Sequence, residues 1–78
     1  MLTLIVANPC PFCDKVVNYI QKSNIADVVI VDTEWDPSEH DRLRREYGKT
    51  QVPLLLIDNQ PLYESDAIID YLRRRTPS

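Results

Sequence analysis

The two cysteines are the feature that most constrains what this chain can fold into. Cys10 and Cys13 are separated by two residues, and they are the only cysteines among 78 residues. They follow a short apolar run at residues 2–6 and precede a segment whose apolar residues have helical spacing. A Cys-x-x-Cys pair between a strand and a helix favours a redox-active dithiol in a reducing compartment.

The position of each cysteine predicts its role. A proline is well suited to the first helical position, so Pro11 places Cys10 at the N-cap of the expected helix. Unpaired backbone N–H groups and the positive end of the helix dipole favour a thiolate there. Cys13 lies one turn later, where it is more covered. We therefore expect Cys10 to be an exposed nucleophile and Cys13 to be the resolving thiol.

A zinc site is the first alternative reading of this cysteine pair. Zinc usually takes four protein ligands in a structural site, and Cys-x-x-Cys supplies two. The single histidine, His40, lies in a charged helical segment, so we expect no bound metal. The second alternative is a pair of inert cysteines. Inert buried cysteines usually lie within apolar stripes, whereas these flank Pro11.

Composition bounds the class of protein. The length predicts a single domain over residues 1–78. A net charge of −3 disfavours nucleic acid or an anionic membrane as the main partner. No apolar run approaches the ~20 residues that span a bilayer, and residues 1–7 are too short for a signal peptide. We therefore expect a cytoplasmic monomer.

Periodicity and turn signals predict an α/β fold with the element order β-α-β-α-β-β-α. The predicted strands are rich in β-branched residues or contain continuous apolar runs, and each predicted helix starts at a proline or a serine. Ser38 is the expected N-cap of the second helix. Four strands in a mixed sheet flanked by three helices form the thioredoxin arrangement. The expected strands are residues 2–6, 25–31, 54–57 and 62–63; the expected helices are residues 11–23, 38–47 and 65–75.

Three motifs give this arrangement a specific resemblance. The segment Cys10-Pro11-Phe12-Cys13 resembles the glutaredoxin active site, whose usual form is Cys-Pro-Tyr-Cys. Gln51-Val52-Pro53, just before a strand, resembles the family's Thr-Val-Pro loop, in which the proline is cis. The segment at residues 64–68, Glu-Ser-Asp-Ala-Ile, resembles the Glu-Ser-x-Ala-Ile of glutathione S-transferase N-terminal domains and the acidic helix start of glutaredoxins. The motifs have the family's order, and the resemblance covers essentially the whole chain.

The resemblance implies a glutathione-dependent thiol–disulfide oxidoreductase. Glutathione would be the co-substrate, and disulfide-bearing proteins would be the partners. An extended Val52 would pair with the backbone of the peptide-like thiol. Ser65 and the helix start would take its γ-glutamyl carboxylate, and Asp66 its ammonium, although simple helix capping remains an alternative for Ser65. The implied glutathione-binding residues are Phe12, Gln51, Val52, Pro53, Ser65 and Asp66.

Departures from the glutaredoxin pattern keep other readings open. Residues 7–9 lack the lysine that many glutaredoxins carry before the first cysteine, so the helix start is the main expected source of thiolate stabilisation. The alternatives are a redoxin served by a protein reductase, an iron–sulfur carrier, which Pro11 disfavours, and a non-catalytic adaptor. The sequence leaves open the roles of Lys49, Arg42 and Arg45, and it assigns none to Trp35.

Overall fold

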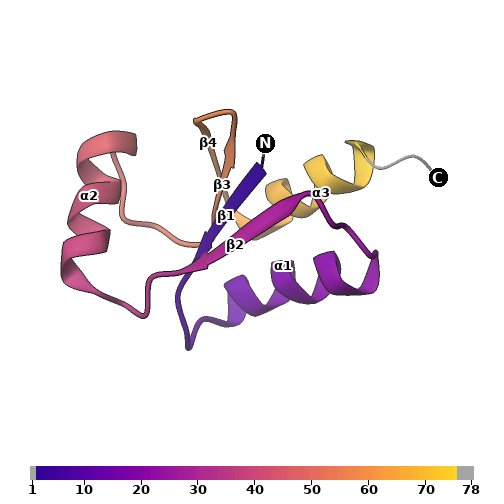
Figure 1. Cartoon of the computed structure of the whole chain (residues 1–78), viewed down its shortest axis with the longest axis horizontal. Helices are drawn as coiled ribbons and strands as arrows, with labels where there is room; N and C mark the ends of the chain where they lie inside the picture. Colours follow the sequence, from indigo (N-terminus) through magenta and orange to yellow (C-terminus); the bar gives the residue numbers. More distant parts are fainter. Residues whose placement is uncertain (1, 76–78) are drawn as a thin grey trace.

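The computed structural model describes residues 2–75, and its elements follow the predicted β-α-β-α-β-β-α order (Figure 1). The last strand is longer than predicted and includes Pro61, and the second strand begins three residues later than expected. No helix within the described residues is long and apolar enough to cross a membrane. The elements are β1 (Leu2–Val6), α1 (Pro11–Lys22), β2 (Val28–Asp32), α2 (Pro37–Tyr47), β3 (Leu54–Ile57), β4 (Gln60–Tyr63) and α3 (Ser65–Arg75).

The four strands form one mixed sheet in the order β2-β1-β3-β4. The pair β1–β2 is parallel, with Val6 opposite Asp32, and the pair β1–β3 is antiparallel, with Ile5 opposite Leu54. The C-terminal ends of β1 and β2 therefore meet the N-terminal end of β3 at one end of the sheet. The candidate site lies at this end, where the loops are residues 7–10, 33–36 and 48–53.

Helices cover both faces of the sheet. Along β1, alternate side chains point to opposite faces, and Leu4 lies in the core cluster with the buried residues of α1 and α3. Ile5 points the other way and lies in a smaller cluster with Leu43 of α2 and Leu54 of β3. Figure 1 shows α2 on one side of the sheet and α1 with α3 on the other. A central strand buried on both faces explains the continuous apolar sequence of β1.

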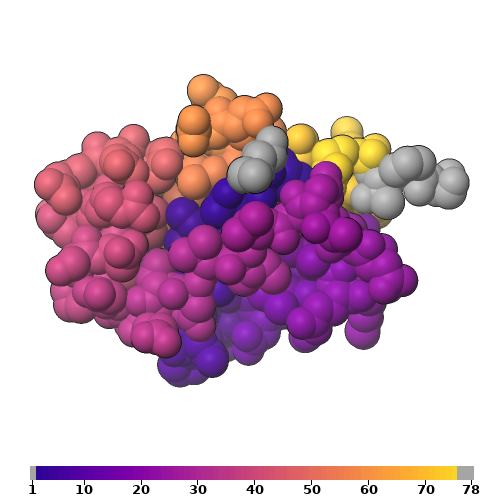
Figure 2. Space-filling model, viewed as in Figure 1, coloured from indigo at the N-terminus to yellow at the C-terminus, as the bar shows by residue number. Residues whose placement is uncertain are grey.

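The edge strand β2 is more exposed than its sequence suggests. Val29, Ile30 and Val31 are 50%, 40% and 39% exposed. The strand pairs only with β1 among the described strands, and Figure 2 shows it at the surface, between α2 and α1. Helix α2 packs over Ile5 and Leu54 instead.

The predicted start of α2 is wrong by two residues. The N-cap is Asp36, not Ser38: the Asp36 carboxylate accepts a hydrogen bond from the Ser38 N–H at 2.9 Å. Pro37 then takes the first helical position, which suits a residue without an N–H. The other end follows the prediction, because Gly48 closes α2 with a φ of 89°, a left-handed conformation that glycine adopts without steric cost.

Candidate active site

Cys10 is the N-cap of α1, as predicted. Its backbone is extended, with φ −159° and ψ 104°, and Pro11 occupies the first position of the helix. The Cys10 Sγ accepts a hydrogen bond from the Cys13 N–H at 3.3 Å. The Cys10 carbonyl accepts from the Asp14 N–H at 3.0 Å. The sulfur thus caps one of the backbone N–H groups that the first turn of a helix leaves without an intrahelical partner.

The expected exposure of Cys10 is wrong. The residue is only 7% exposed, and Cys13 is 1% exposed. The loop after β1 turns back against the sheet, so both cysteines pack in the core cluster that contains Val6 and Val16. Cys10 remains the more accessible of the two. Little of Cys10 is therefore accessible to a disulfide, so the surfaces around it influence which disulfides can reach it.

Burial changes the acidity of the Cys13 thiol. The pKa of the Cys13 thiol is raised from 9.0 to about 12, with burial as the largest cause and the hydrogen bond with the Cys10 side chain as the second. A negative charge on Cys10 would also raise it. Cys13 is therefore a neutral thiol at neutral pH, when a thiolate is required for attack on a disulfide. That Cys10 is the nucleophile and Cys13 the resolving thiol stays a prediction.

The peptide bond between Val52 and Pro53 is cis, as predicted. Pro53 is buried and leads directly into β3, whose Leu54 lies opposite Ile5 of β1. Val52 packs against the core cluster that includes both cysteines. The bond between Asn8 and Pro9 is also cis, which the sequence did not predict.

A pocket of about 360 Å³ lies beside the first turn of α1. Three segments form it: the first turn of α1, the loop before β3, and the start of α3. The structure brings together every residue predicted to bind glutathione, and it adds Glu64; that these residues bind the tripeptide stays a prediction. The lining residues are Phe12, Gln51, Val52, Pro53, Glu64, Ser65 and Asp66.

The polar groups of the pocket come mainly from the start of α3. Ser65 is buried, at 8% exposed, and it begins this eleven-residue helix. Glu64 has a left-handed φ of 74°, and its carboxylate accepts a hydrogen bond from the Gln51 side-chain amide at 2.9 Å. The Asp66 carboxylate forms an ion pair with Lys15 of α1. Asp66 is therefore already paired with a cation, the ammonium group of Lys15.

The basic residues left open by the sequence lie outside the pocket lining. The Lys49 ammonium lies 4.9 Å from the centre of the Tyr63 ring, within cation–π range. Arg42 forms ion pairs with Glu39 and Glu46 along the exposed side of α2. Arg45 lies 3.6 Å from the Asp41 carboxylate. These contacts engage the three cations locally.

No cluster of three or more metal-ligating side chains occurs within residues 2–75. His40 is engaged otherwise: its Nε2 lies 2.8 Å from the Thr33 hydroxyl, and its ring stacks on Trp35.

Neither Trp35 nor Glu64 was singled out as a site residue from the sequence. The Glu-Ser motif could have indicated Glu64, because it immediately precedes Ser65; no local signal indicates Trp35.

The fold and the cysteine geometry together define a class. A four-stranded mixed sheet with three helices and a Cys-x-x-Cys pair at the start of the first helix is a thioredoxin-fold module of redox type. The family model of the glutathione S-transferase N-terminal domain matches residues 4–78. The chain therefore belongs to this family.

Solved structures support the fold. A glutathione transferase family member from Pseudomonas fluorescens Pf-5, solved with bound glutathione, is 26% identical and has a TM-score of 0.81. The match includes 100% of this chain and 40% of the transferase chain. A thioredoxin-like protein is 22% identical with a TM-score of 0.71, and the match includes 95% of this chain and 97% of that protein. The holo form of glutaredoxin C1 from Populus tremula x tremuloides is 16% identical with a TM-score of 0.73, and the match includes 95% of this chain and 75% of the glutaredoxin chain.

The match to the transferases is partial in length. The chain spans between 34% and 40% of the length of the five glutathione S-transferase structures compared. It spans almost the whole thioredoxin-like protein and three quarters of the glutaredoxin. No curated protein matches the sequence.

Proposed function

We propose that the protein is a glutathione-dependent thiol–disulfide oxidoreductase, with Cys10 as its nucleophile. The observation that carries this proposal is the pocket beside the first turn of α1. Phe12 lines it two residues after Cys10, and the Val52-Pro53 loop and the start of α3 complete it. A nucleophile placed next to a ligand-sized pocket suits a reaction in which one sulfur of the disulfide belongs to a small molecule.

The lining suits a γ-glutamyl thiol such as glutathione. The volume, about 360 Å³, falls in the range of roughly 300–1,000 Å³ typical of small-molecule sites. Val52 can offer backbone groups to a peptide-like ligand. The N–H groups at the start of α3 favour a carboxylate, and the Ser65 hydroxyl can donate to it. The Glu64 and Asp66 carboxylates lie beside this helix start, where they can accept hydrogen bonds from an ammonium group.

The reaction starts from a mixed disulfide between a protein and glutathione. The Cys10 thiolate attacks the glutathione sulfur, so a Cys10–glutathione disulfide forms while the original S–S bond breaks. The protein sulfur leaves with the electron pair and takes a proton from solvent. A second glutathione thiolate then attacks the bound glutathione sulfur; glutathione disulfide forms, and Cys10 leaves as the thiolate.

Resolution by Cys13 is the competing route. Cys13 would attack the Cys10 sulfur, forming the Cys10–Cys13 disulfide and releasing glutathione. This step needs the Cys13 thiolate, and burial, the largest cause of the raised pKa of that thiol, disfavours the charged form. The route through a second glutathione is therefore favoured at neutral pH.

Replacing Ser65 by alanine tests the carboxylate site. We expect Ser65→Ala to raise the KM for glutathione by about 10-fold, because a hydrogen bond to a charged group contributes roughly 1.5–3 kcal/mol, and to change kcat little. The measurement is the steady-state reduction of a glutathionylated peptide at varied glutathione concentration. Ser38→Ala is the matched control, since Ser38 is an exposed serine near the start of α2. An unchanged KM in a folded Ser65→Ala variant would remove Ser65 from the proposed site.

A further inference from the structure

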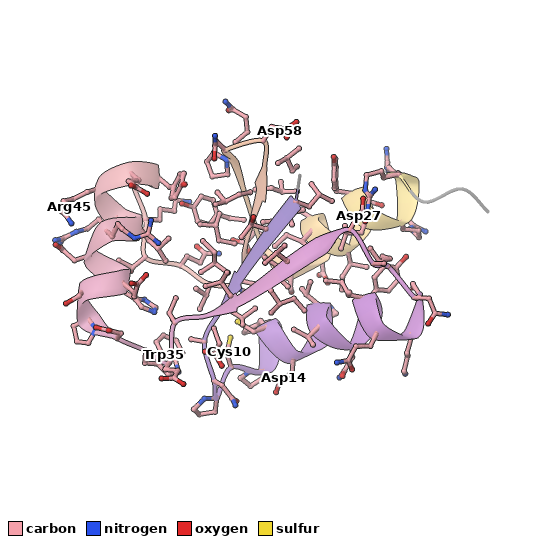
Figure 3. All side chains as sticks on the ribbon, in the orientation of Figure 1. Cys10, Asp14, Asp27, Trp35, Arg45 and Asp58 are labelled. Atoms are coloured by element: carbon pink, nitrogen blue, oxygen red, sulfur yellow. The ribbon has the colours of Figure 1, made fainter. Side chains whose placement is uncertain are left out.

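Cys10 lies between two different surfaces at the end of the sheet where β1 terminates. Strand β1 is the neighbour of both β2 and β3. The loop before β3 contributes Val52 and Pro53 to the pocket on one side of β1. On the other side, residues 33–36 follow β2; together with Asp32, the last residue of that strand, we call them the acidic loop. Its residue Trp35 lies next to Cys10 in Figure 3. The pocket accounts for the first surface, and nothing proposed so far uses the second.

The acidic loop is fixed to the segment before Cys10 by hydrogen bonds. The backbone N–H of Thr33 donates to the Val6 carbonyl at 2.9 Å, and its hydroxyl donates to the same carbonyl at 3.2 Å. The Trp35 indole N–H donates to the Pro9 carbonyl at 3.2 Å. Pro9 directly precedes Cys10, so the indole lies within one residue of the nucleophile. The acidic loop is therefore fixed against the segment that leads into Cys10.

Trp35 is held in place and is still half-exposed. Its ring stacks on His40, with the ring centres 5.2 Å apart and the planes at 24°. The residue remains 47% exposed. Glu34 and Trp35 both have left-handed backbones, with φ of 54° and 58°. Such a conformation costs non-glycine residues roughly 1–3 kcal/mol, and it clusters at functional sites. The loop thus maintains an unfavourable backbone while presenting a large aromatic ring to solvent.

The ionisable side chains of the acidic loop all have the same sign. Asp32, Glu34 and Asp36 are exposed, and all three are acidic. Two of these carboxylates also shape the backbone: Asp32 accepts from the Glu34 N–H and Asp36 accepts from the Ser38 N–H. An exposed indole on a loop that also carries three carboxylates attracts a cationic group, because an aromatic ring face and the carboxylates both favour positive charge.

We propose that Trp35 and the acidic loop are the docking surface for the polypeptide part of a disulfide substrate, and that they select an arginine or lysine beside the substrate cysteine. The inference rests on the proposed role of Cys10 as nucleophile, and it does not depend on glutathione. The small thiol would occupy the pocket on the β3 side, while the basic segment of the protein would lie along the acidic loop on the β2 side. Trp35 is then a specificity-determining residue.

The test uses single-turnover attack on peptide disulfides without glutathione. A capped peptide with arginine next to its cysteine is joined through a disulfide to thionitrobenzoate, and a second peptide has glutamate in place of arginine. The Cys10 thiolate attacks the peptide sulfur, the Cys10–peptide disulfide forms, and the aryl thiolate leaves with the electron pair and is measured by absorbance. Reduced full-length protein should react about 10-fold faster with the arginine peptide, and added salt should reduce the difference.

The variants separate docking from a structural role. Trp35→Ala should slow the reaction with the arginine peptide by about 10-fold, while the rate with the small disulfide of thionitrobenzoate itself stays within about two-fold. Trp35→Phe keeps a ring and loses the hydrogen bond to Pro9, so it should retain most of the arginine preference. Glu34→Gln should weaken that preference, and Glu46→Gln on the exposed side of α2 is the matched control.

Two results would overturn the inference. The first is equal rates for the arginine and glutamate peptides with the wild-type protein. The second is an equal decrease in the reaction rates of Trp35→Ala with the arginine peptide and with the small disulfide, since this would mean that Trp35 only holds the Cys10 segment in place. Failure of the proposed function looks different. In that case the peptide disulfides would react through Cys10, with the arginine preference intact, while glutathione supported no turnover.

Discussion

Replacing Cys10 by serine is expected to lower glutathione-dependent turnover by roughly 10³-fold or more, because it removes the nucleophile that forms the covalent intermediate. Cys13→Ser should retain most of the activity. The reason is the neutral state of Cys13 near neutral pH, which leaves the second glutathione as the faster resolving thiol. The measurement is the release of a glutathionylated peptide in the presence of glutathione.

The pair of variants is matched in chemistry and differs only in position. Both change a thiol to a hydroxyl in the first turn of α1 or at its cap. A folded Cys10→Ser protein with full activity would contradict the assignment of the nucleophile. Loss of activity in Cys13→Ser with accumulation of the Cys10–glutathione disulfide would instead show that Cys13 resolves the intermediate.

The second large expected effect is a loss of stability at high pH through Cys13. Below pH 9 the thiol is protonated in both the folded and the unfolded chain, so its contribution is complete there. Its pKa rises from 9.0 to about 12 on folding, so between these values the unfolded chain loses the proton first. The free energy of unfolding should therefore fall by roughly 4 kcal/mol across this range.

The comparison protein for this prediction is Cys13→Ala. Alanine has no proton to lose, so this variant should show a much shallower decline over the same pH range. The measurement is urea unfolding of the reduced protein at a series of pH values, with and without the substitution. Parallel pH profiles for the two proteins would show that Cys13 titrates alike in the folded and unfolded chains.

Local chemistry made the main features predictable from the sequence. Pro11 fits the first helical turn, so the N-cap position of Cys10 followed from the residue after it. The cis bond at Val52-Pro53 followed from the resemblance of that loop to a known one. The apolar sequence of β1 correctly indicated a strand buried on both faces. In each case the deciding interaction lies within a few residues, or within one motif.

The errors arose where tertiary packing decides. The burial of Cys10 depends on how the loop after β1 folds against the sheet, which the motif does not encode. The N-cap of α2 is the exception, because its cause is local: Ser38 and Asp36 are both good caps, and Pro37 at the first helical position selects Asp36. The exposure of β2 could not be read from its apolar sequence, because it depends on where α2 packs.

The pocket shows the same limit within the candidate site. Six of its residues came from motifs, and Glu64 was missed although it lies beside Ser65. The hydrogen bond between Gln51 and Glu64 joins residues thirteen positions apart, and the ion pair between Lys15 and Asp66 joins α1 to α3. Trp35 meets Pro9 only because β1 and β2 are parallel neighbours. Such contacts follow from the topology and not from local spacing.

The most direct test of the central claim is to locate glutathione on the protein. Titration of the isotope-labelled, reduced protein with S-methylglutathione, which cannot form a disulfide, should shift the backbone amide signals of Val52, Ser65 and Asp66 in a saturable way. Signals of the exposed side of α2, such as Arg44, should stay in place. Saturable shifts confined to the pocket are the predicted result. Unchanged signals at Val52, Ser65 and Asp66 at saturating ligand would contradict the account.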